Sequence, residues 1–387
     1  MPFLNTKKER RVVILDIGSA SIGGAVVSIK KNKPPVVLYT VRKQIIVKEN
    51  IDFQRFLYLM SDTLDLVLME LEKSKNASLD EVFCILSSPW YTSMTHFMKI
   101  ERKESFTVTR KMIDDLINKK VSMINNDVIK KKKIAGGVPR VIDVQSIQIK
   151  LNGYETNNPY GKKVNLVEAA LFVSIGSEKT IKLIEDKVSR VFRNKVRFSS
   201  FSLASFVAIR DIFNEKSFLF IDITGEVTDV SMVKNNILIK NIAFPLGKNF
   251  LIRRIASSLN TTIEEAESLF SMFNSGSSDA VTNDKLNKIL NEAKKEWVSS
   301  FAEILQSFSE SLSIPNSVFI TADKDIRVWF KDAIKKEEFG QFTITNDEFD
   351  IKILDEKLVG EFCLLKNNNI SKDPFIMLEA IFVDRII

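Results

Sequence analysis

Two short motifs, one in each half of the chain, contain side chains that could bind a nucleotide. In the first, an apolar run ends at Asp16 and is followed by a turn of small residues that begins at Gly18. In the second, an apolar run ends at Asp222 and the turn contains Gly225. Backbone N–H groups in such turns can bind phosphate, and the carboxylates can hold a metal-bound water. The pair therefore predicts two hairpin tips that face each other across a phosphate-binding cleft.

The elements that must position these tips occur in the same order in both halves. The first half contains three predicted strands, a helix and a fourth strand, at residues 12–16, 25–29, 36–41, 51–73 and 82–86. Apolar residues at three- and four-residue steps support the helix. The second half repeats the order at residues 218–223, 227–233, 237–243, 248–259 and 318–321. Internal duplication at this scale predicts an α/β protein built from two similar lobes.

Two segments are predicted to be insertions into this repeated pattern. Residues 87–195 are expected to contain helices and strands at 110–123, 141–151, 164–174 and 178–191, which indicates an α+β subdomain. Residues 258–314 are predicted to be helical. In a last predicted helix, 375–387, the charged residues are Glu379, Asp384 and Arg385, and we expect this helix to pack in the core.

The composition excludes several classes of protein. The chain has 387 residues, 45% hydrophobic and 27% charged, as in a soluble globular protein of two or more units. It has no window of 18 apolar residues and no apolar leader, so we expect neither a membrane-spanning helix nor a secretory signal. Cys84 and Cys363 are far apart and His96 is the only histidine, which argues against a zinc site or a Ser-His-Asp triad. The net charge of +7 is modest, and we expect no nucleic-acid partner.

The whole chain resembles the actin-like ATPase superfamily. It is most similar to the FtsA-type cell-division proteins, with the PilM-type pilus-assembly proteins as near relatives. The strings that carry the resemblance lie at residues 104–118, 158–161, 202–205, 245–247, 254–256 and 264–267. The resemblance implies a two-lobed actin-like fold, which is a duplicated ribonuclease-H-like unit, with an inserted α+β subdomain of the SHS2 type.

The resemblance also predicts the domain boundaries. The first lobe would comprise residues 1–86 and a helix within 196–216, and the SHS2-type subdomain residues 87–195. The second lobe would comprise residues 217–257 and 315–387, where its closing strand and helices lie, with 258–314 as its helical insertion.

The resemblance implies that ATP and magnesium bind between the lobes. Asp16 and Asp222 would be the metal ligands. Gly18 would let the backbone approach phosphate, and Ser19 and Ala20 would donate N–H groups. The full set of expected cofactor-binding residues is Asp16, Gly18, Ser19, Ala20, Ser21, Asp222, Thr224, Gly225, Thr228, Gly247, Glu267, Phe270, Thr321 and Ala322.

Several positions depart from the pattern of the family. Ser21 stands where the family has a lysine, so one cation near the phosphates is missing. Glu226 replaces a glycine, and its carboxylate would repel a triphosphate unless a cation intervened. Ala322 and Asp323 replace two further glycines, and Phe270 replaces a lysine. We favour a core position for Phe270 over stacking on a purine. These departures predict weakened or lost ATP binding and, at most, slow hydrolysis.

The resemblance implies a cytoplasmic scaffold, peripheral at the inner face of the cell membrane, rather than an enzyme. The first hypothesis is an FtsA-like scaffold of cell division that self-associates head to tail and binds an FtsZ-like tubulin homologue. The alternative is a PilM-like adaptor of a type IV pilus or secretion platform that binds the cytoplasmic tail of a membrane protein. A second alternative is an active actin-fold ATPase or kinase. Because the last helix is expected in the core, contact with the membrane should be indirect.

Overall fold

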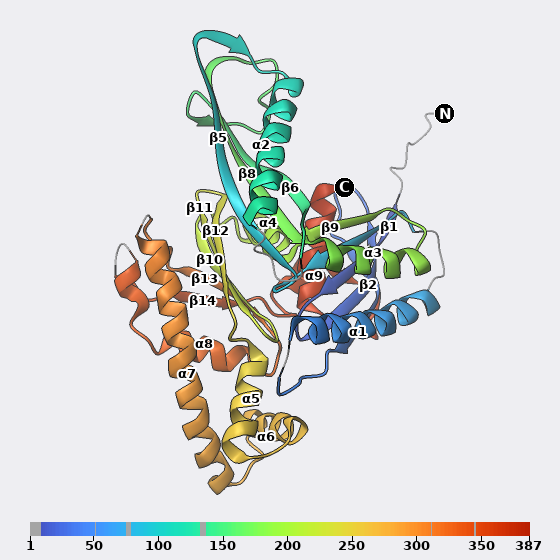
Figure 1. The fold of residues 1–387 in the computed structure, drawn as a ribbon, viewed down its shortest axis with the longest axis vertical. Helices are drawn as coiled ribbons and strands as arrows, with labels where there is room; N and C mark the ends of the chain where they lie inside the picture. Colours follow the sequence, from blue (N-terminus) through green and yellow to red (C-terminus); the bar gives the residue numbers. More distant parts are fainter. Residues whose placement is uncertain (1–8, 51, 75–78, 132–136, 311, 344–345) are drawn as a thin grey trace.

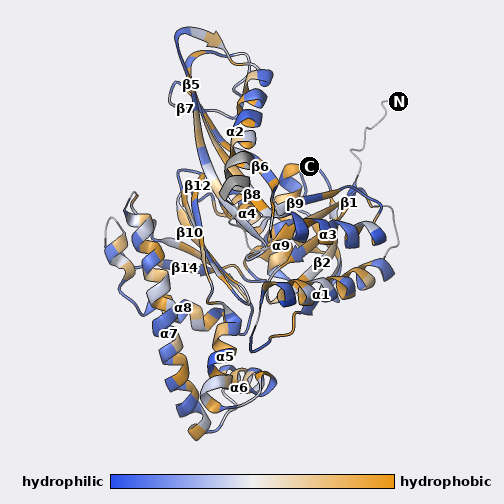
Figure 2. Cartoon of the chain, in the orientation of Figure 1, coloured by the Kyte–Doolittle hydropathy of each residue, from blue (hydrophilic) through white to orange (hydrophobic). Residues whose placement is uncertain are grey.

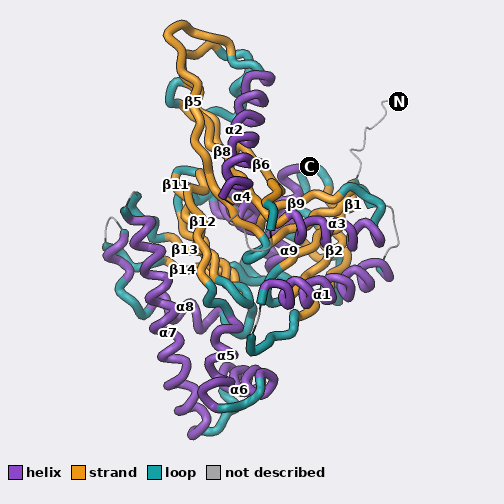
Figure 3. Tube along the Cα trace, viewed as in Figure 1, coloured by secondary structure: helices purple, strands orange, loops and turns teal. Residues whose placement is uncertain are grey.

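Two β-sheets with covering helices form the body of the molecule, and a third sheet projects from it (Figure 1). The computed structural model describes residues 9–50, 52–74, 79–131, 137–310, 312–343 and 346–387, without the side chains of 125–131. Helices lie beside all three sheets, and the third sheet, with a helix along it, extends away from the body (Figure 3). Each of the two hairpins predicted from the sequence belongs to one of the two body sheets.

The first sheet has the strand order β15-β3-β2-β1-β4-β9. Its strands are β1 (Arg10–Ile17), β2 (Ser21–Ile29), β3 (Val36–Gln44), β4 (Glu81–Leu86), β9 (Val196–Ser200) and β15 (Leu364–Leu365). Strand β1 is antiparallel to β2 and parallel to β4. Because helices cover both faces, β1 is apolar on both faces, as is typical of central strands in α/β proteins.

The helices on the two faces of this sheet come from distant parts of the chain. They are α1 (Phe53–Lys73) and α3 (Glu178–Val191) on one face, and α4 (Phe201–Phe213) and α9 (Pro374–Ile386) on the other. Val13 and Leu15 of β1 pack toward α1, whereas Val12 and Ile14 pack toward α4 and α9. Helix α9 is mostly hydrophobic, whereas α1 carries hydrophilic residues along its outer side (Figure 2).

The second sheet repeats the arrangement of the first, with the order β12-β11-β10-β13-β14. Its strands are β10 (Phe218–Ile223), β11 (Thr228–Lys234), β12 (Ile237–Phe244), β13 (Ser317–Ala322) and β14 (Asp350–Ile353). Strand β10 is antiparallel to β11 and parallel to β13, as β1 is to β2 and β4. Its helices are α5 (Lys248–Leu259), α6 (Ile263–Ser275), α7 (Ala280–Ser309) and α8 (Arg327–Lys335), with short helices η1 (Phe339–Phe342) and η2 (Val359–Glu361) nearby in the chain. The predicted duplication of an α/β unit is therefore confirmed.

The third sheet, with the order β5-β8-β6-β7, forms the arm at the top of Figure 1. Its elements are β5 (Tyr91–Thr107), α2 (Arg110–Lys131), β6 (Pro139–Leu151), β7 (Tyr154–Glu155) and β8 (Lys163–Ser177). Helix α2 packs on one face of the sheet, where Ile124 meets Met98 and Leu171. The segment therefore has its own small α+β core, as predicted, and α2 is two turns longer than the expected helix 110–123.

Three predicted boundaries differ from the structure. The inserted segment was expected to end at 195, but α3 packs on α1 in the first lobe, where Ile181 and Ile184 join its core. The segment 196–216 begins with strand β9 before its helix. The segment 315–387 was assigned to the second lobe, but β15 pairs with β3 and α9 covers the first sheet. Periodicity indicates that a helix has one buried face but not which sheet covers that face, and this explains the errors.

The packing of α9 in the core can be tested by shortening one of its buried side chains. Leu378 of α9 has no exposed surface, so Leu378→Ala should lower the free energy of unfolding by about 2–5 kcal/mol. Leu66→Ala on α1, where the side chain is 52% exposed, is the matched control and should change it by less than about 0.5 kcal/mol. Urea unfolding measures both values. Equal, small effects of the two changes would show that α9 does not pack in the core.

Candidate functional site

The two hairpin tips lie in direct contact. The Ser19 hydroxyl donates a hydrogen bond to Thr224 Oγ1 at 2.7 Å and accepts one from the backbone N–H of Glu226 at 2.9 Å. Gly225 lies so close to the first tip that a Cβ atom there would be 2.8 Å from both Cα and N of Ala20. Only glycine allows this approach. The polar groups that could surround a phosphate instead bind one another across the cleft.

Asp16, the expected magnesium ligand, is bound by an arginine of the same lobe. Arg42 on β3 donates from Nη2 to Asp16 Oδ2 at 2.7 Å, and from Nη1 to the Ser21 hydroxyl at 2.8 Å. Its Nε and Nη2 also donate to the two carboxylate oxygens of Asp373, at 2.7 and 3.0 Å. A Cβ atom at Gly23, which pairs with Arg42 across β2 and β3, would be 2.6 Å from Arg42 Nη2. The guanidinium therefore occupies space that a glycine leaves open beside the carboxylate.

A fourth ionisable side chain, Glu379 of α9, lies in the same buried cluster. Burial, together with the Asp16 carboxylate, raises the pKa of Glu379 well above its usual range. Burial also raises the pKa of Asp16, and Arg42 opposes this effect. Because Asp16 is bonded to Arg42, and because the contact with Asp16 raises the pKa of Glu379 but lowers that of Asp16, we assign the proton to Glu379, which can donate it to the Asp16 carboxylate. The ionised cluster then consists of one guanidinium between the carboxylates of Asp16 and Asp373.

At the second tip, the unexpected carboxylate of Glu226 is also bound by an arginine. Arg253 of α5 donates to both Glu226 oxygens, at 2.8 and 2.6 Å, and the Asn249 side-chain amide donates to Oε1 at 2.7 Å. Arg253 Nε also donates to the backbone carbonyl of Lys48 in the first lobe. The cation required beside Glu226 is thus part of the chain, and this ion pair links the two lobes.

The N-terminal end of α5 is used by the same tip. The backbone N–H groups of Lys248 and Asn249 donate to the carbonyls of Thr224 and Gly225, at 2.9 and 2.7 Å. A Cβ atom at Gly247 would be 2.6 Å from the Gly225 carbonyl oxygen, so glycine is required for this packing. Free N–H groups at a helix N-terminus often bind phosphate. Here these two bind the hairpin itself.

Asp222 is buried within its own lobe and does not line the cavity at the tips. It accepts a hydrogen bond from the Thr321 hydroxyl at 2.7 Å. Burial raises its pKa well above the usual range, and the neighbouring Asp229 and Asp16 raise it further. The pKa of Asp229 is itself raised by burial to about 7. Burial beside other carboxyl groups therefore favours the neutral form of Asp222, whereas a metal ligand must be ionised.

The free space between the tips is very small. The cavity there has a volume of about 20 Å³ and is lined by Asp16, Gly18, Ser19, Ala20, Ser21, Arg42, Ser87, Ile223, Thr224, Asp323 and Phe375. That is room for roughly one water molecule, whereas pockets for nucleotide-sized ligands measure about 300–1,000 Å³. Magnesium and a triphosphate do not fit this arrangement of residues, because Arg42 occupies the carboxylate and the two tips touch.

The structure brings together some of the predicted residues and separates others. Asp16, Gly18, Ser19, Ala20, Ser21 and Thr224 line one cavity, and Gly225 and Gly247 pack beside it. Thr228 instead bonds to the Leu246 carbonyl and to the Trp297 indole in the core. Phe270 is 1% exposed and lies in the core of the second lobe, as favoured from the sequence.

At the expected adenosine end, charged side chains pair with one another. Lys248 Nζ lies 3.2 Å from Asp323 and 2.8 Å from Asp325. Glu267 is exposed on α6. Partial burial raises its pKa, and the nearby Lys248 opposes this rise. Ala322 is buried at the end of β13.

The sequence does not predict the charged residues that pair beside the two tips, which are Arg42, Arg253, Asp373 and Glu379. A signal existed for two of them. Arg42 interrupts an apolar strand, and Glu379 is a single carboxylate within the apolar part of a helix. Charged residues in such positions are rarely buried without a partner, so each predicts an ion pair or a shared proton. Nothing in the sequence identifies which partners they find.

Comparison with known proteins supports the fold. No protein-family model matches the sequence, and no curated protein matches it. A solved PilM–PilN type IV pilus biogenesis complex contains a chain that is similar with a TM-score of 0.60 and 13% identity, over 96% of both chains. A MamK double helical filament has a TM-score of 0.49 at 10% identity, covering 97% of this chain and 99% of that one. The ethanolamine utilization protein EutJ from Carboxydothermus hydrogenoformans has a TM-score of 0.46 at 11% identity, covering 98% and 92%.

At such low sequence identity, the similarity shows the fold alone. The predicted two-lobed actin-like ATPase fold is confirmed. Among the described residues, no helix has the length and hydropathy needed to cross a membrane.

The contribution of Arg42 to stability can be measured by replacing it with an uncharged residue. Arg42→Met removes the cation and leaves Asp16 and Asp373 buried without it, so the free energy of unfolding should fall by about 3–5 kcal/mol. The matched control is Arg254→Met, which breaks a more exposed pair with Glu296 and should cost about 0–1 kcal/mol. Urea unfolding of both variants measures the difference. A loss below about 1 kcal/mol for Arg42→Met would contradict the assignment of a tightly held buried pair.

Proposed function

We propose that this chain is an actin-fold scaffold that binds a protein partner and has lost, or nearly lost, ATP binding between its lobes. The observation that carries the proposal is Arg42, whose guanidinium lies against Asp16 where a metal-bound water was expected. The positive charge of Arg42 already balances the negative charge of the Asp16 carboxylate, so a magnesium ion is not needed to neutralise it. Arg42 also blocks approach from the cleft, because the cavity beside it has only about 20 Å³.

Opening this cleft for a nucleotide would be costly. Separating Arg42 from Asp16 and Asp373 leaves buried charges without partners, at a cost of about 3–5 kcal/mol. Binding ATP would also require the Ser19–Thr224 hydrogen bond and the Gly225–Ala20 contact to break. These costs would weaken an otherwise micromolar ATP site by two orders of magnitude or more, since about 1.4 kcal/mol is a factor of ten. Hydrolysis, which needs the metal, would be weakened further.

Two scaffold roles compete, and the comparison of structures favours one of them. The chain with the TM-score of 0.60 belongs to a PilM–PilN type IV pilus biogenesis complex, which supports an adaptor that binds a membrane protein of a pilus or secretion platform. The burial of α9 in the first lobe is consistent with this role, because that helix is not free to lie on a membrane. Contact with the membrane would then be indirect, through the partner, on the cytoplasmic side.

The FtsA-like role in cell division, with head-to-tail self-association and an FtsZ-like partner, stays a prediction from the sequence. So does the assignment of the projecting sheet and α2 to the SHS2 type. No observation favours an active ATPase or kinase, because the cleft offers neither a free metal ligand nor space for a substrate among the described residues.

The loss of ATP binding can be measured directly. Isothermal titration calorimetry with ATP and magnesium should show no binding tighter than a Kd of about 0.1 mM, which corresponds to about −5.5 kcal/mol. The physical reason is the occupied carboxylate and the closed tips. Asp16→Ala is the matched variant, since it removes the expected metal ligand. Micromolar affinity in the wild type that Asp16→Ala abolishes would overturn the proposal.

The adaptor role predicts a defined class of partner. Peptides that cover the cytoplasmic tails of membrane proteins encoded beside this chain's gene should include one that binds with a Kd of about 1–100 μM, as expected for a short segment that orders on binding. Fluorescence anisotropy with a scrambled tail as control measures this. Binding of the C-terminal tail of a tubulin homologue instead would support the FtsA-like role. Failure of every tail would count against an adaptor of either kind.

A further inference from the structure

The arm is fixed to the first lobe at its base. Its chain enters from β4 and leaves into α3, and both of these elements belong to the first lobe. The Ser174 hydroxyl of β8 donates to Ser200 Oγ at 2.8 Å in a buried position. Just before β5, the Trp90 indole N–H donates to the carbonyl of Gly18 in the first hairpin tip at 2.9 Å. The arm and the first tip are therefore joined directly.

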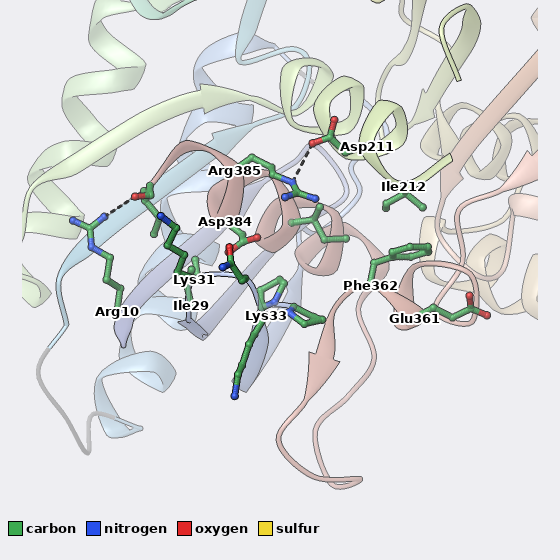
Figure 4. Close-up of a pocket in the computed structure, with 15 residues that line it drawn as sticks. Arg10, Ile29, Lys31, Lys33, Asp211, Ile212, Glu361, Phe362, Asp384 and Arg385 are labelled. Atoms are coloured by element: carbon green, nitrogen blue, oxygen red, sulfur yellow. Dashed lines mark hydrogen bonds and ion pairs between the residues drawn. The ribbon is translucent and has the colours of Figure 1, made fainter. Parts of the chain in front are cut away.

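The part of the first lobe that supports the arm includes a layer of two helices. Phe172 of β8 is 1% exposed and belongs to the buried cluster that contains α4, α9 and one face of the first sheet. Helices α4 and α9 pack on each other, and Asp211 of α4 pairs with Arg385 of α9 at 3.0 Å (Figure 4). This pair lies in the wall of a cavity of about 640 Å³ at the edge of the lobe. Because the two helices are joined to each other, the base of the arm packs on a single unit.

The arm also covers the edge of the second sheet. Among the described strands, β12 pairs with β11 alone, so its outer side has no partner strand. Strands β5 and β6 of the arm lie beside β12. The Thr95 hydroxyl donates to the Leu238 carbonyl, and the Gln148 side-chain amide donates at 3.1 Å to the carbonyl of Asn235, in the turn before β12. Proteins commonly cover the unpaired groups of an edge strand, and here the arm does so across the boundary between the lobes.

The arm and the hairpin tips hold the second lobe at points that lie far apart. Near one end of β12, Leu238 binds the arm, whereas at the other end Phe244 pairs with Thr228, next to the second tip. These two positions on β12 are about 20 Å apart at the rise of a β-strand. Two links between the same two bodies reinforce each other, because each link keeps the partners of the other within reach. The contact of the arm with β12 should therefore help to keep the tips together.

We propose that the arm is a strap, fixed to the first lobe and holding the second, so that the position of the arm controls whether the two hairpin tips stay in contact. While Thr95 and Gln148 bind the second lobe, the tips remain together. When the arm moves away from β12, the tips separate more often. The inference rests on the contacts of the arm and of the tips, and it does not depend on the loss of ATP binding.

Hydrogen exchange at one backbone amide reports the contact between the tips. The N–H of Glu226 donates across the cleft to Ser19 Oγ, so it exchanges when the tips separate. The N–H of Asn249 donates to the Gly225 carbonyl within the second lobe, so it reports on that lobe alone. Exchange rates measured by NMR on the full chain therefore distinguish separation of the tips from loosening of the second lobe.

The test is the double variant Thr95→Val, Gln148→Met, which removes both donors of the arm and keeps the size of the side chains. The amide of Glu226 should exchange about tenfold faster than in the wild type, because one hydrogen bond contributes a factor of roughly two to ten. Each single replacement should give a smaller increase. The exchange of the Asn249 amide should not change.

The matched control is Thr156→Val, which removes a hydroxyl that donates to the Asn158 carbonyl within the arm. It should leave the exchange of both amides unchanged, and melting temperatures show that all variants are folded. The proposal is overturned if the amide of Glu226 exchanges at the wild-type rate in the folded double variant. It is also overturned if the Asn249 amide accelerates equally, because the second lobe itself would then have loosened.

Discussion

A guanidinium buried between two carboxylates determines the state of the cleft. Arg42 lies against Asp16 of β1 and Asp373, which are both buried, and its own side chain is 20% exposed. In such surroundings a charge is tolerated only when it is paired and hydrogen-bonded, so the three side chains constrain one another. Asp373 also accepts hydrogen bonds from the backbone N–H groups of Phe375 and Ile376, which begins α9. One cation thus joins the first hairpin to the start of the closing helix.

The same physical requirement acts at the second hairpin. Glu226 would be an uncompensated carboxylate at the tip, but Arg253 binds it in a bidentate arrangement and also reaches the carbonyl of Lys48 in the other lobe. With the Ser19–Thr224 hydrogen bond, these contacts hold the lobes together across the cleft. In a nucleotide-binding actin fold the ligand can supply that link. In this protein, side chains form such a link, through Arg253 and Lys48 and through Ser19 and Thr224.

Much of the fold could be predicted from the sequence, whereas the ion pairs that form beside the two hairpin tips could not. The duplicated hairpins at Asp16 and Asp222 have a local signature, because strands that are buried on both faces are continuous apolar runs. The partners of Asp16 have no such signature, since Asp373 is 331 residues from Arg42 along the chain. Helix α9 packs on the first sheet. Helical periodicity predicts that one face of α9 is buried, but it does not predict which sheet that face contacts. The departures at Ser21 and Glu226 predict an altered site, and in the structure Arg42 donates to Ser21 and Arg253 to Glu226.

The most direct measurement of this account is a crystal structure of the protein grown with ATP and magnesium at millimolar concentration. The account predicts electron density for the Arg42 guanidinium between Asp16 and Asp373, contact between Gly225 and Ala20, and no nucleotide between the hairpin tips. A metal-bound triphosphate at Asp16, with Arg42 displaced and the tips apart, would contradict it.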